Sequence, residues 1–516
     1  MADLIFYNGT VNTMKGQTAS AVAVAGSVIQ AVGSDEEILL MADPGCRVID
    51  LQGRCVMPGF QDSHCHLLLT GLGYERLNLR GVTSVDQLIQ AGRDYIRENQ
   101  IPAGIWIQGE GFDNTLFDDP ALPDYHVIEA ISTEHPILLE RVCGHVGTAN
   151  RLAMKTIGFD EHTRITGGVI DLDREGQITG VLREAALDQF KMRIPKPRLE
   201  DVKRCIVAAA RNANQYGVTS VHTDDLEGAE LHTLLQAYRE LEEEGTLTVR
   251  VWEEIQAARI PVLNKFLEMG LRTGDGTDYF RIGNIKLLTD GSLGARTAYM
   301  REDYCDDPGN RGVAVYTQEE LDEVALAAHQ AGMQIACHAI GDGSVEQCVG
   351  ALEKAYQSDG VDLRNRIVHC QFGDRELFAR MARNHIAADI QPSFTISDIP
   401  YVACRMGARE EQGYCWKTML EEGVHLGGGS DSPVESFDPI WGIHCVVNRT
   451  DASGQPEGGW HPDQKLTVEE AAALYTTEGA YLTFEENKKG AVAPGYLADL
   501  AVLSADLFHT APEHIL

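Results

Sequence analysis

The sequence predicts an α/β fold: a TIM (β/α)8 barrel with a small β-sandwich domain built from both chain ends and an insertion over the barrel mouth. Short apolar strand candidates alternate with helical stretches through the middle of the chain, which is typical of a parallel barrel. Both ends of the chain instead carry short strands separated by turn residues. The 516 residues are enough for one large barrel and a smaller domain.

Seven barrel strands are expected, each at an apolar run followed by polar residues. They lie at 60–66, 218–224, 281–290, 334–338, 366–370, 388–392 and 425–429. The second strand is expected at either 105–109 or 136–140, which makes 218–224 the third. The stretch from 67 to 187 exceeds one βα unit, and 167–171 with 177–180 is typical of a hairpin. We therefore assign this stretch to an insertion.

The two ends of the chain share a pattern of short strand-like runs. Residues 3–56 contain strand-like runs, and 489–495 and 498–503 return to the same pattern near the end. We expect a composite β-sandwich from residues 1–57 and 488–516. The barrel is then expected at 58–487, with the insertion at approximately 67–187.

The amino-acid composition limits the classes of binding partner to be expected. The formal net charge of −34 repels nucleic acid and anionic lipid, so neither is an expected partner. No start typical of a signal peptide and no run of ~18 apolar residues is found, which predicts a cytoplasmic protein acting on a small molecule. The twelve cysteines are scattered, as reduced buried residues would be. A homodimer is expected on base rates.

Two histidines, His64 and His66, close the first strand candidate. Side chains alternate along a strand, so these two point to the same side and can meet one metal ion. The pair alone is weak evidence, because 17 histidines in 516 residues produce roughly half of one such pair by chance. Two ordinary histidines near a strand end remain the alternative at this point.

Other metal-binding residue types end further strand candidates. His369 follows His338 by 31 residues, and Asp431 follows His369 by 62. Eight units spread over ~250 residues repeat about every 31 residues, so the three fall on strands five, six and eight, whose C-terminal ends meet at one mouth. We expect a divalent metal there, zinc first. The expected ligands are His64, His66, Lys286, His338, His369 and Asp431.

Lys286 is the unusual member of this set, because a protonated amine repels a nearby cation. Carboxylation by CO2 would turn it into N6-carboxylysine, a carbamate whose two oxygens can bridge two metals ~3.5–4 Å apart. The alternative is an ion pair, for example with Asp290, and a single metal. One or two metals per chain are therefore expected.

Several motifs together resemble a known family, the amidohydrolase superfamily. The resemblance is to its YtcJ-like branch (amidohydrolase family 3), which also includes N-substituted formamide deformylases. It implies a TIM barrel flanked by a β-sandwich, with metal roles for the same six residues. The chain stops soon after 505–507, where relatives usually continue, so we expect the sandwich to be either incomplete or differently closed. The motifs are 58–60 with 62–66, 144–150, 286–294 with 296–298, 337–342 and 428–433.

The expected reaction is hydrolysis of a carbon–nitrogen bond other than a peptide bond, in an amide, N-formyl group, carbamate or cyclic amide. A metal-activated water attacks the carbonyl, and Asp431 is expected to pass its proton to the departing nitrogen. His145 resembles a family position near the substrate and is expected to stabilise the carbonyl oxygen. A hydrogen-bonded loop histidine is the alternative.

Four further residues are expected to contact the substrate: His222, Trp106, Phe112 and Arg296. His222 could instead support the ligands from behind, and Trp106 could be a core residue. Two rival functions stay open. One is a mononuclear deaminase of a heterocyclic amine on the same scaffold, and the other is a catalytically silent metal-binding barrel.

Overall fold

The computed structural model describes residues 2–516 and divides into two units. Unit 1 contains the residues up to Gly71 together with Arg198–Leu516, and unit 2 contains Leu72–Pro197. Unit 2 thus falls largely within the expected insertion at 67–187. Its place over the barrel mouth stays a prediction, as does the expected boundary between sandwich and barrel. No helix among residues 2–516 is both long and apolar enough to cross a membrane.

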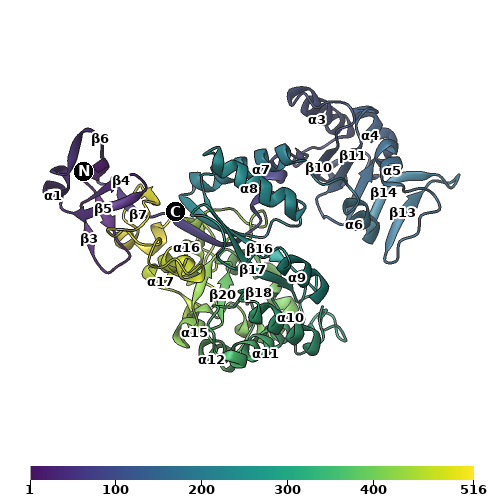
Figure 1. Cartoon of the computed structure of the whole chain (residues 1–516). Helices are drawn as coiled ribbons and strands as arrows, with labels where there is room; N and C mark the ends of the chain where they lie inside the picture. Colours follow the sequence, from purple (N-terminus) through teal and green to yellow (C-terminus); the bar gives the residue numbers. More distant parts are fainter. Residues whose placement is uncertain (1) are drawn as a thin grey trace. The chain divides into compact units, whose positions relative to one another are not determined.

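Eight parallel strands form the central sheet of unit 1, and their spatial order follows the chain (Figure 1). Hydrogen bonds of 2.8 Å, from Asp431 N to His64 O and from His66 N to Ser432 O, join the last strand region to the first. The sheet is therefore nearly closed, as in a TIM barrel. Its strands are β8 (Phe60–Cys65), β15 (Val218–Thr223), β16 (Arg250–Gln256), β17 (Phe280–Leu288), β18 (Ile335–Ala339), β19 (Arg366–His369), β20 (Ala387–Ile390) and β21 (Leu426–Gly428).

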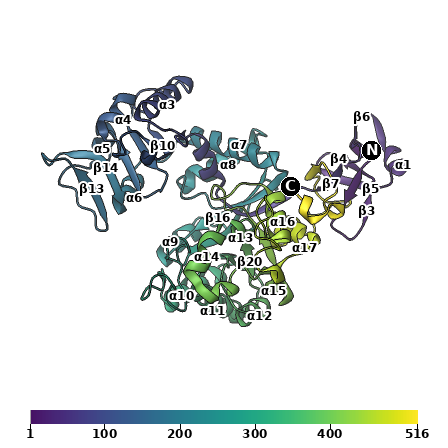
Figure 2. The same cartoon turned by 180° about the vertical axis from the view of Figure 1, so that it is seen from behind.

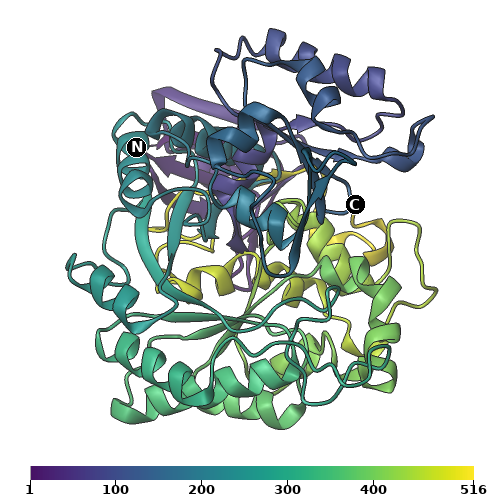
Figure 3. The same ribbon diagram turned by 90° about the vertical axis from the view of Figure 1, so that its right-hand side faces the viewer.

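Helices lie outside these strands, as the side view in Figure 3 shows. Every residue of β8, β19, β20 and β21 is buried, as expected for parallel strands covered on both faces. A capping box of Thr317 and Glu320 starts α10. The helices are α2 (Leu67–Tyr74), α7 (Leu199–Gln215), α8 (Leu231–Glu243), α9 (Ile260–Leu267), α10 (Gln318–Gln330), α11 (Asp342–Asp359), α12 (Arg375–Arg383), α13 (Phe394–Ser397), α14 (Ile399–Met406), α15 (Trp416–Glu421), α16 (Pro439–Asn448), α17 (Val468–Leu474) and α18 (Thr477–Leu482).

The structure corrects the expected second strand. The runs at 105–109 and 136–140 overlap β10 (Ile107–Phe112) and β11 (Ile137–Arg141), which pair in the sheet of unit 2. The second barrel strand is β15, which was expected to be the third. The third is β16, which was not expected because Glu253 and Glu254 interrupt its apolar pattern. The other seven barrel strands lie at the expected positions, with His338, His369 and Asp431 at strands five, six and eight.

Both chain ends contribute to the small sheets of unit 1. One has the order β5-β4-β1-β6 and the other β22-β7-β2-β3, in which β22 from the C-terminal end pairs antiparallel with β7. Val11, Val22, Val56 and Val492 share one hydrophobic cluster. A closed β-sandwich stays a prediction. The elements are β1 (Ala2–Tyr7), β2 (Thr10–Asn12), β3 (Thr18–Ala19), β4 (Ala21–Ala25), β5 (Val28–Gly33), α1 (Asp35–Leu39), β6 (Ala42–Asp50), β7 (Cys55–Pro58) and β22 (Leu500–Leu503).

Unit 2 has its own six-stranded sheet with the order β13-β14-β12-β11-β10-β9 (Figure 2). The expected hairpin is the antiparallel pair β13 and β14. Leu138 and Leu139 are neighbours on β11 but belong to different hydrophobic clusters, because strand side chains alternate. The other elements are β9 (Leu77–Asn78), α3 (Val85–Glu98), α4 (Tyr125–Ile131), β12 (Val146–Ala149), α5 (Arg151–Ile157), β13 (Gly168–Leu172), β14 (Ile178–Glu184) and α6 (Ala185–Lys191).

Candidate functional site

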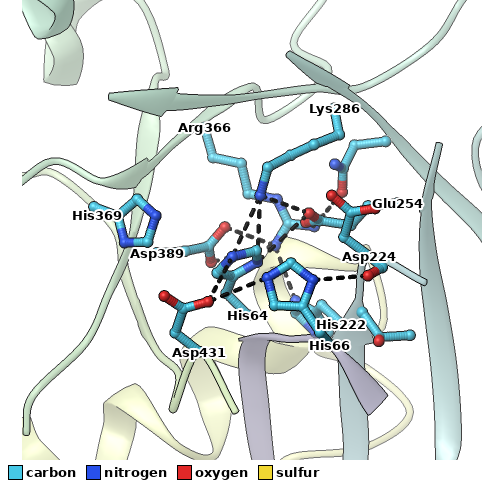
Figure 4. Close-up of polar contacts among 12 residues, drawn as sticks. His64, His66, His222, Asp224, Glu254, Lys286, Arg366, His369, Asp389 and Asp431 are labelled. Carbon is cyan, nitrogen blue, oxygen red and sulfur yellow. Dashed lines mark hydrogen bonds and ion pairs between the residues drawn. The ribbon is translucent and has the colours of Figure 1, made fainter. Parts of the chain in front are cut away.

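The six side chains expected to bind metal lie together at the C-terminal ends of the barrel strands, and Figure 4 labels all of them except His338. The His64 and His369 ring centroids are 5.6 Å apart, and those of His338 and His369 are 4.5 Å apart. The Lys286 amine lies 3.3 Å from Nε2 of His64. The six are His64 on β8, His66 directly after it, Lys286 on β17, His338 on β18, His369 at the end of β19 and Asp431 after β21.

Three of these residues present atoms at distances that suit one metal ion. One ligand atom each from His64, His66 and Asp431 lies within 4.8 Å of the other two. Oδ1 of Asp431 is 3.5 Å from Nε2 of His64 and 3.3 Å from Nε2 of His66. Ligand atoms of a tetrahedral zinc ion lie roughly 3.3–3.5 Å apart, since each is ~2.0–2.1 Å from the metal. The donor set therefore fits a divalent ion.

Three histidines use one ring nitrogen for a partner outside the cluster. Nδ1 of His66 lies 2.8 Å from the Asp224 carbonyl oxygen, and Nδ1 of His369 lies 2.6 Å from Oε1 of Gln391. Nε2 of His338 lies 3.2 Å from the Gly291 carbonyl oxygen. Each acceptor favours a proton on the nitrogen that faces it, so the other nitrogen is the one that would bind a metal, as in metal-binding histidines.

The protonation states of three of the four histidines suit metal binding. Burial, with the charge of Lys286, lowers the pKa of His338 to about 4 and also lowers that of His64. Burial and His338 lower the pKa of His369 well below its ordinary value. Although burial opposes the charge, Asp431 raises the pKa of His66 to about 9. Three of the rings are therefore neutral and can bind a metal directly, whereas His66 must first release the proton that Asp431 stabilises, because histidine binds a metal only in its deprotonated form.

Asp431 carries a charge at the centre of this cluster. Burial works against its ionised form, but hydrogen bonding to His66 and the nearby histidines outweigh burial and hold the pKa of Asp431 well below its ordinary value. Its backbone is left-handed, with φ of 56°, a conformation that costs energy in a residue with a side chain. The Asp431 N–H bond to His64 O holds the residue in this conformation.

Lys286 pairs with Glu254, and not with Asp290, which was the example given for the ion-pair alternative. Its amine lies 3.1 Å from Oε2 of Glu254. Asp290 instead accepts backbone N–H bonds from Tyr299 at 3.0 Å and Gly341 at 2.9 Å. The Asp290 carboxylate is thereby occupied in joining the loops after β17 and β18, which explains why it is not the partner of Lys286.

A fully buried arginine lies behind the cluster (Figure 4). Arg366 contacts Oδ1 of Asn284 at 2.6 Å, Nδ1 of His222 at 2.9 Å and Asp389 at 3.3 Å. His222, expected to contact the substrate, is completely buried, and burial with the Arg366 charge lowers its pKa well below the ordinary value. The structure thus places His222 behind the ligand side chains.

The other three predicted substrate residues have contacts of their own. Arg296 makes two hydrogen bonds to Asp306, of 3.0 and 2.8 Å, in a loop of unit 1. In unit 2, Phe112 is completely buried in a hydrophobic cluster, and Trp106 packs edge-on against Phe190. Arg296 is thus engaged within its own loop, and Phe112 and Trp106 pack within unit 2. Their contacts with substrate stay predictions.

His145 also belongs to unit 2. It is an exposed residue whose Nδ1 lies 3.0 Å from Oε2 of Glu184. Its expected contact with the substrate carbonyl stays a prediction.

Sequence reasoning missed several residues of this site. Glu254 lies on the unexpected strand β16, where paired glutamates in an apolar run were the available sign. Phe394 stacks on His369 with ring centroids 6.2 Å apart, and Gln391 orients the same histidine. Oδ1 of Asp62 accepts the Ser430 N–H at 3.1 Å. No local pattern identifies Phe394 or Gln391, because their contacts with His369 join residues distant in sequence, and Asp62 appeared only as part of the motif at 62–66.

A parallel barrel with this set of side chains at its C-terminal strand ends is the arrangement of a metal-dependent hydrolase. The model of the amidohydrolase family matches residues 47–516, so the chain belongs to that family. It is 33% identical to the YtcJ protein of Bacillus subtilis (strain 168), over 99% of this chain and 96% of that protein. The expected family is thus confirmed, and the chain is an enzyme that hydrolyses amide-type bonds.

Two further comparisons agree with this assignment. The chain is 25% identical to an N-substituted formamide deformylase of Arthrobacter pascens, over 98% of this chain and 94% of the relative. The crystal structure of an uncharacterized metal-dependent hydrolase from Pyrococcus furiosus superposes with a TM-score of 0.82 at 28% identity. That match covers 98% of this chain and 99% of the other. The fold and the metal-dependent class are therefore shared along the whole chain.

Proposed function

We propose that the protein hydrolyses a carbon–nitrogen bond other than a peptide bond, in an amide, N-formyl group, carbamate or cyclic amide. The observation that carries the proposal is the position of Oδ1 of Asp431, within 3.5 Å of Nε2 of both His64 and His66. The proposed ligands are these three residues with Lys286, His338 and His369. Zinc is the proposed ion because imidazole and carboxylate ligands suit it.

A divalent metal at this site would supply an acidified water and a positive charge for the substrate carbonyl. Asp431 is the proposed general base. As the water oxygen bonds to the carbonyl carbon, Oδ2 of Asp431 accepts the proton that the water loses. It then donates that proton to the nitrogen as the carbon–nitrogen bond breaks. Oδ1 meanwhile keeps its contacts with His64 and His66.

Lys286 is proposed to enter the site as N6-carboxylysine, which would permit two metals. Its amine lies 3.3 and 3.4 Å from the two ring nitrogens of His64, so a carbamate there would lie among the other ligands. An unmodified amine paired with Glu254 is the one-metal alternative. Metal counting on the wild type and on Lys286→Ala distinguishes the two.

The substrate class is tested with the purified, metal-loaded enzyme. The deformylase relative supports N-alkyl and N-aryl formamides as the first substrates, followed by linear amides, carbamates and lactams. Release of formate or amine, abolished by chelation and restored by metal, is expected. Ammonia release from heterocyclic amines would favour the deaminase alternative. No turnover across the whole panel with metal bound would favour the catalytically silent barrel.

Three expectations accompany this proposal and stay predictions. They are a small-molecule substrate as the binding partner in place of nucleic acid or membrane, a homodimer, and a cytoplasmic location. The acidic net charge of −34 supports the first, because it disfavours polyanionic partners. Light scattering of the purified protein measures the second.

A further inference from the structure

Glu254 is a buried acid in direct reach of two proposed metal ligands. It lies on β16, the third barrel strand, and is completely buried. Its Oε2 atom is 3.1 Å from the Lys286 amine and 3.5 Å from Nδ1 of His64 (Figure 4). One carboxylate oxygen thus faces two residues that come from two other strands, β17 and β8.

We propose that Glu254 is a positioning residue of the metal centre, whose Oε2 accepts hydrogen bonds from Lys286 and His64 and orients both toward the metal. The inference rests on the proposed function. Glu254 does not touch the reacting atoms. It acts through the two ligands, and its expected effect is on metal affinity and ligand geometry.

The contact with His64 selects the tautomer of that ring. A proton on Nδ1 faces Oε2 of Glu254, which leaves the lone pair on Nε2. Nε2 is the nitrogen that lies 3.5 Å from Oδ1 of Asp431, on the side where the ligand atoms gather. A carboxylate that holds a metal-binding histidine in this way orients the ring and raises the basicity of the ligand. His64 thereby gains the outer partner that the other three histidines already have.

The contact with Lys286 works in both proposed states of that residue. An unmodified ammonium donates one of its N–H groups to Oε2. Carboxylation joins Nζ of the neutral amine to the carbon of CO2, releases one proton to solvent and leaves a single N–H. If that N–H still donates to Glu254, the carbamate oxygens must point away from β16, because the carbamate group is planar. Glu254 would then set the plane of the bridging group.

Arg366 holds the other end of the Glu254 carboxylate in place. Its Nη2 lies 3.9 Å from Oε1 of Glu254, while the same guanidinium contacts Asn284 and His222. Oε1 has no hydrogen-bond partner within residues 2–516. A buried carboxylate between two buried cations has little freedom to turn away. The position of Oε2 is therefore defined by the surrounding barrel.

The neighbouring residue offers a matched control. Glu253 is also completely buried on β16, but its Oε1 accepts the backbone N–H of Asp225 at 3.2 Å. Strand alternation turns the two side chains to opposite faces. The same substitution at Glu253 and Glu254 removes the same carboxyl group from one strand, and only the second touches proposed ligands.

The test measures zinc affinity by chelator competition and the visible spectrum of the cobalt-loaded protein. Glu254→Met, which removes the acceptor, is expected to weaken zinc binding by about 10–100-fold and to shift the cobalt bands. Glu254→Gln, which keeps one acceptor oxygen, is expected to recover part of the affinity. Glu253→Met is expected to bind zinc as the wild type does, although its melting temperature falls.

Affinity within twofold of wild type in Glu254→Met would overturn the inference. So would equal losses in Glu253→Met and Glu254→Met, since these would report a general loss of structure. If the methionine variants fail to fold, Glu254→Gln is compared with Glu253→Gln under the same criteria. A wild type that binds no zinc or cobalt would instead contradict the proposed function itself.

Discussion

Nε2 of His66 lies 3.3 Å from Oδ1 of Asp431, and this contact joins the first and last strands of the barrel. His66 follows β8 and Asp431 follows β21. The contact exists only when the barrel is closed, so metal binding at this point depends on the complete barrel. In the proposed function, His66 is a metal ligand and Asp431 is both a metal ligand and the general base.

Replacing Asp431 by Asn is expected to lower kcat by about 10²–10⁴-fold, because the amide cannot accept the proton lost by the water. Asn keeps the shape of the side chain but not its charge, so the ion pair with His66 is lost and the melting temperature of the metal-free protein is expected to fall. Steady-state kinetics on an active amide substrate measure the effect. A kcat within threefold of wild type would remove Asp431 from the role of general base.

The variant His145→Ala tests whether His145 contacts the substrate or is only a hydrogen-bonded histidine of a loop. If His145 stabilises the carbonyl oxygen, kcat is expected to fall by about 10²–10³-fold while the metal content stays that of the wild type. His126→Ala is a suitable control, since this histidine belongs to helix α4 of the same unit. Equal kinetics for both variants would assign His145 to a hydrogen-bonded loop.

Cys55 gives the terminal sheets a predictable response to alkaline pH. Burial and the charge of Asp506 raise the pKa of the Cys55 thiol to about 12. Its unfolded value is near 9, so between these values the unfolded chain loses a proton that the folded chain keeps. The stability due to this thiol is therefore present below pH 9 and is lost as the pH rises toward 12.

Urea unfolding of the wild type and Cys55→Ala tests this expectation. The free-energy difference between the two should shrink between pH 9 and 10.5, by at most about 1.4 kcal/mol per pH unit. Asn12→Ala, which removes the donor 3.2 Å from the sulfur, should keep the thiol in place. A difference that stays constant with pH would mean that the thiol is not protected in the folded state.

Much of the site follows from two rules that the sequence makes visible. Strand alternation predicts that His64 and His66 share a side, and the barrel repeat places His338, His369 and Asp431 on their strands. Both rules concern residues close to strand ends, where apolar runs stop. The structure agrees with them because the parallel barrel imposes one spacing on every unit.

The residues that support the ligands could not be predicted in the same way. Glu254 breaks the apolar pattern that identifies a strand, so β16 itself was missed. The carbonyl groups of Asp224 and Gly291 orient two histidines, yet a backbone carbonyl has no residue type to recognise. The second strand was misassigned because β10 and β11 are as apolar as a barrel strand and differ only in their partners.

The most direct test of the central claim is elemental analysis of the purified, unchelated protein alongside Lys286→Ala. We predict about two metals per chain in the wild type and fewer in the variant, as expected for a carbamate-bridged pair. One metal that the substitution leaves unchanged would contradict the bridge and favour the one-metal form. No metal in the wild type, even after reconstitution, would contradict the account as a whole.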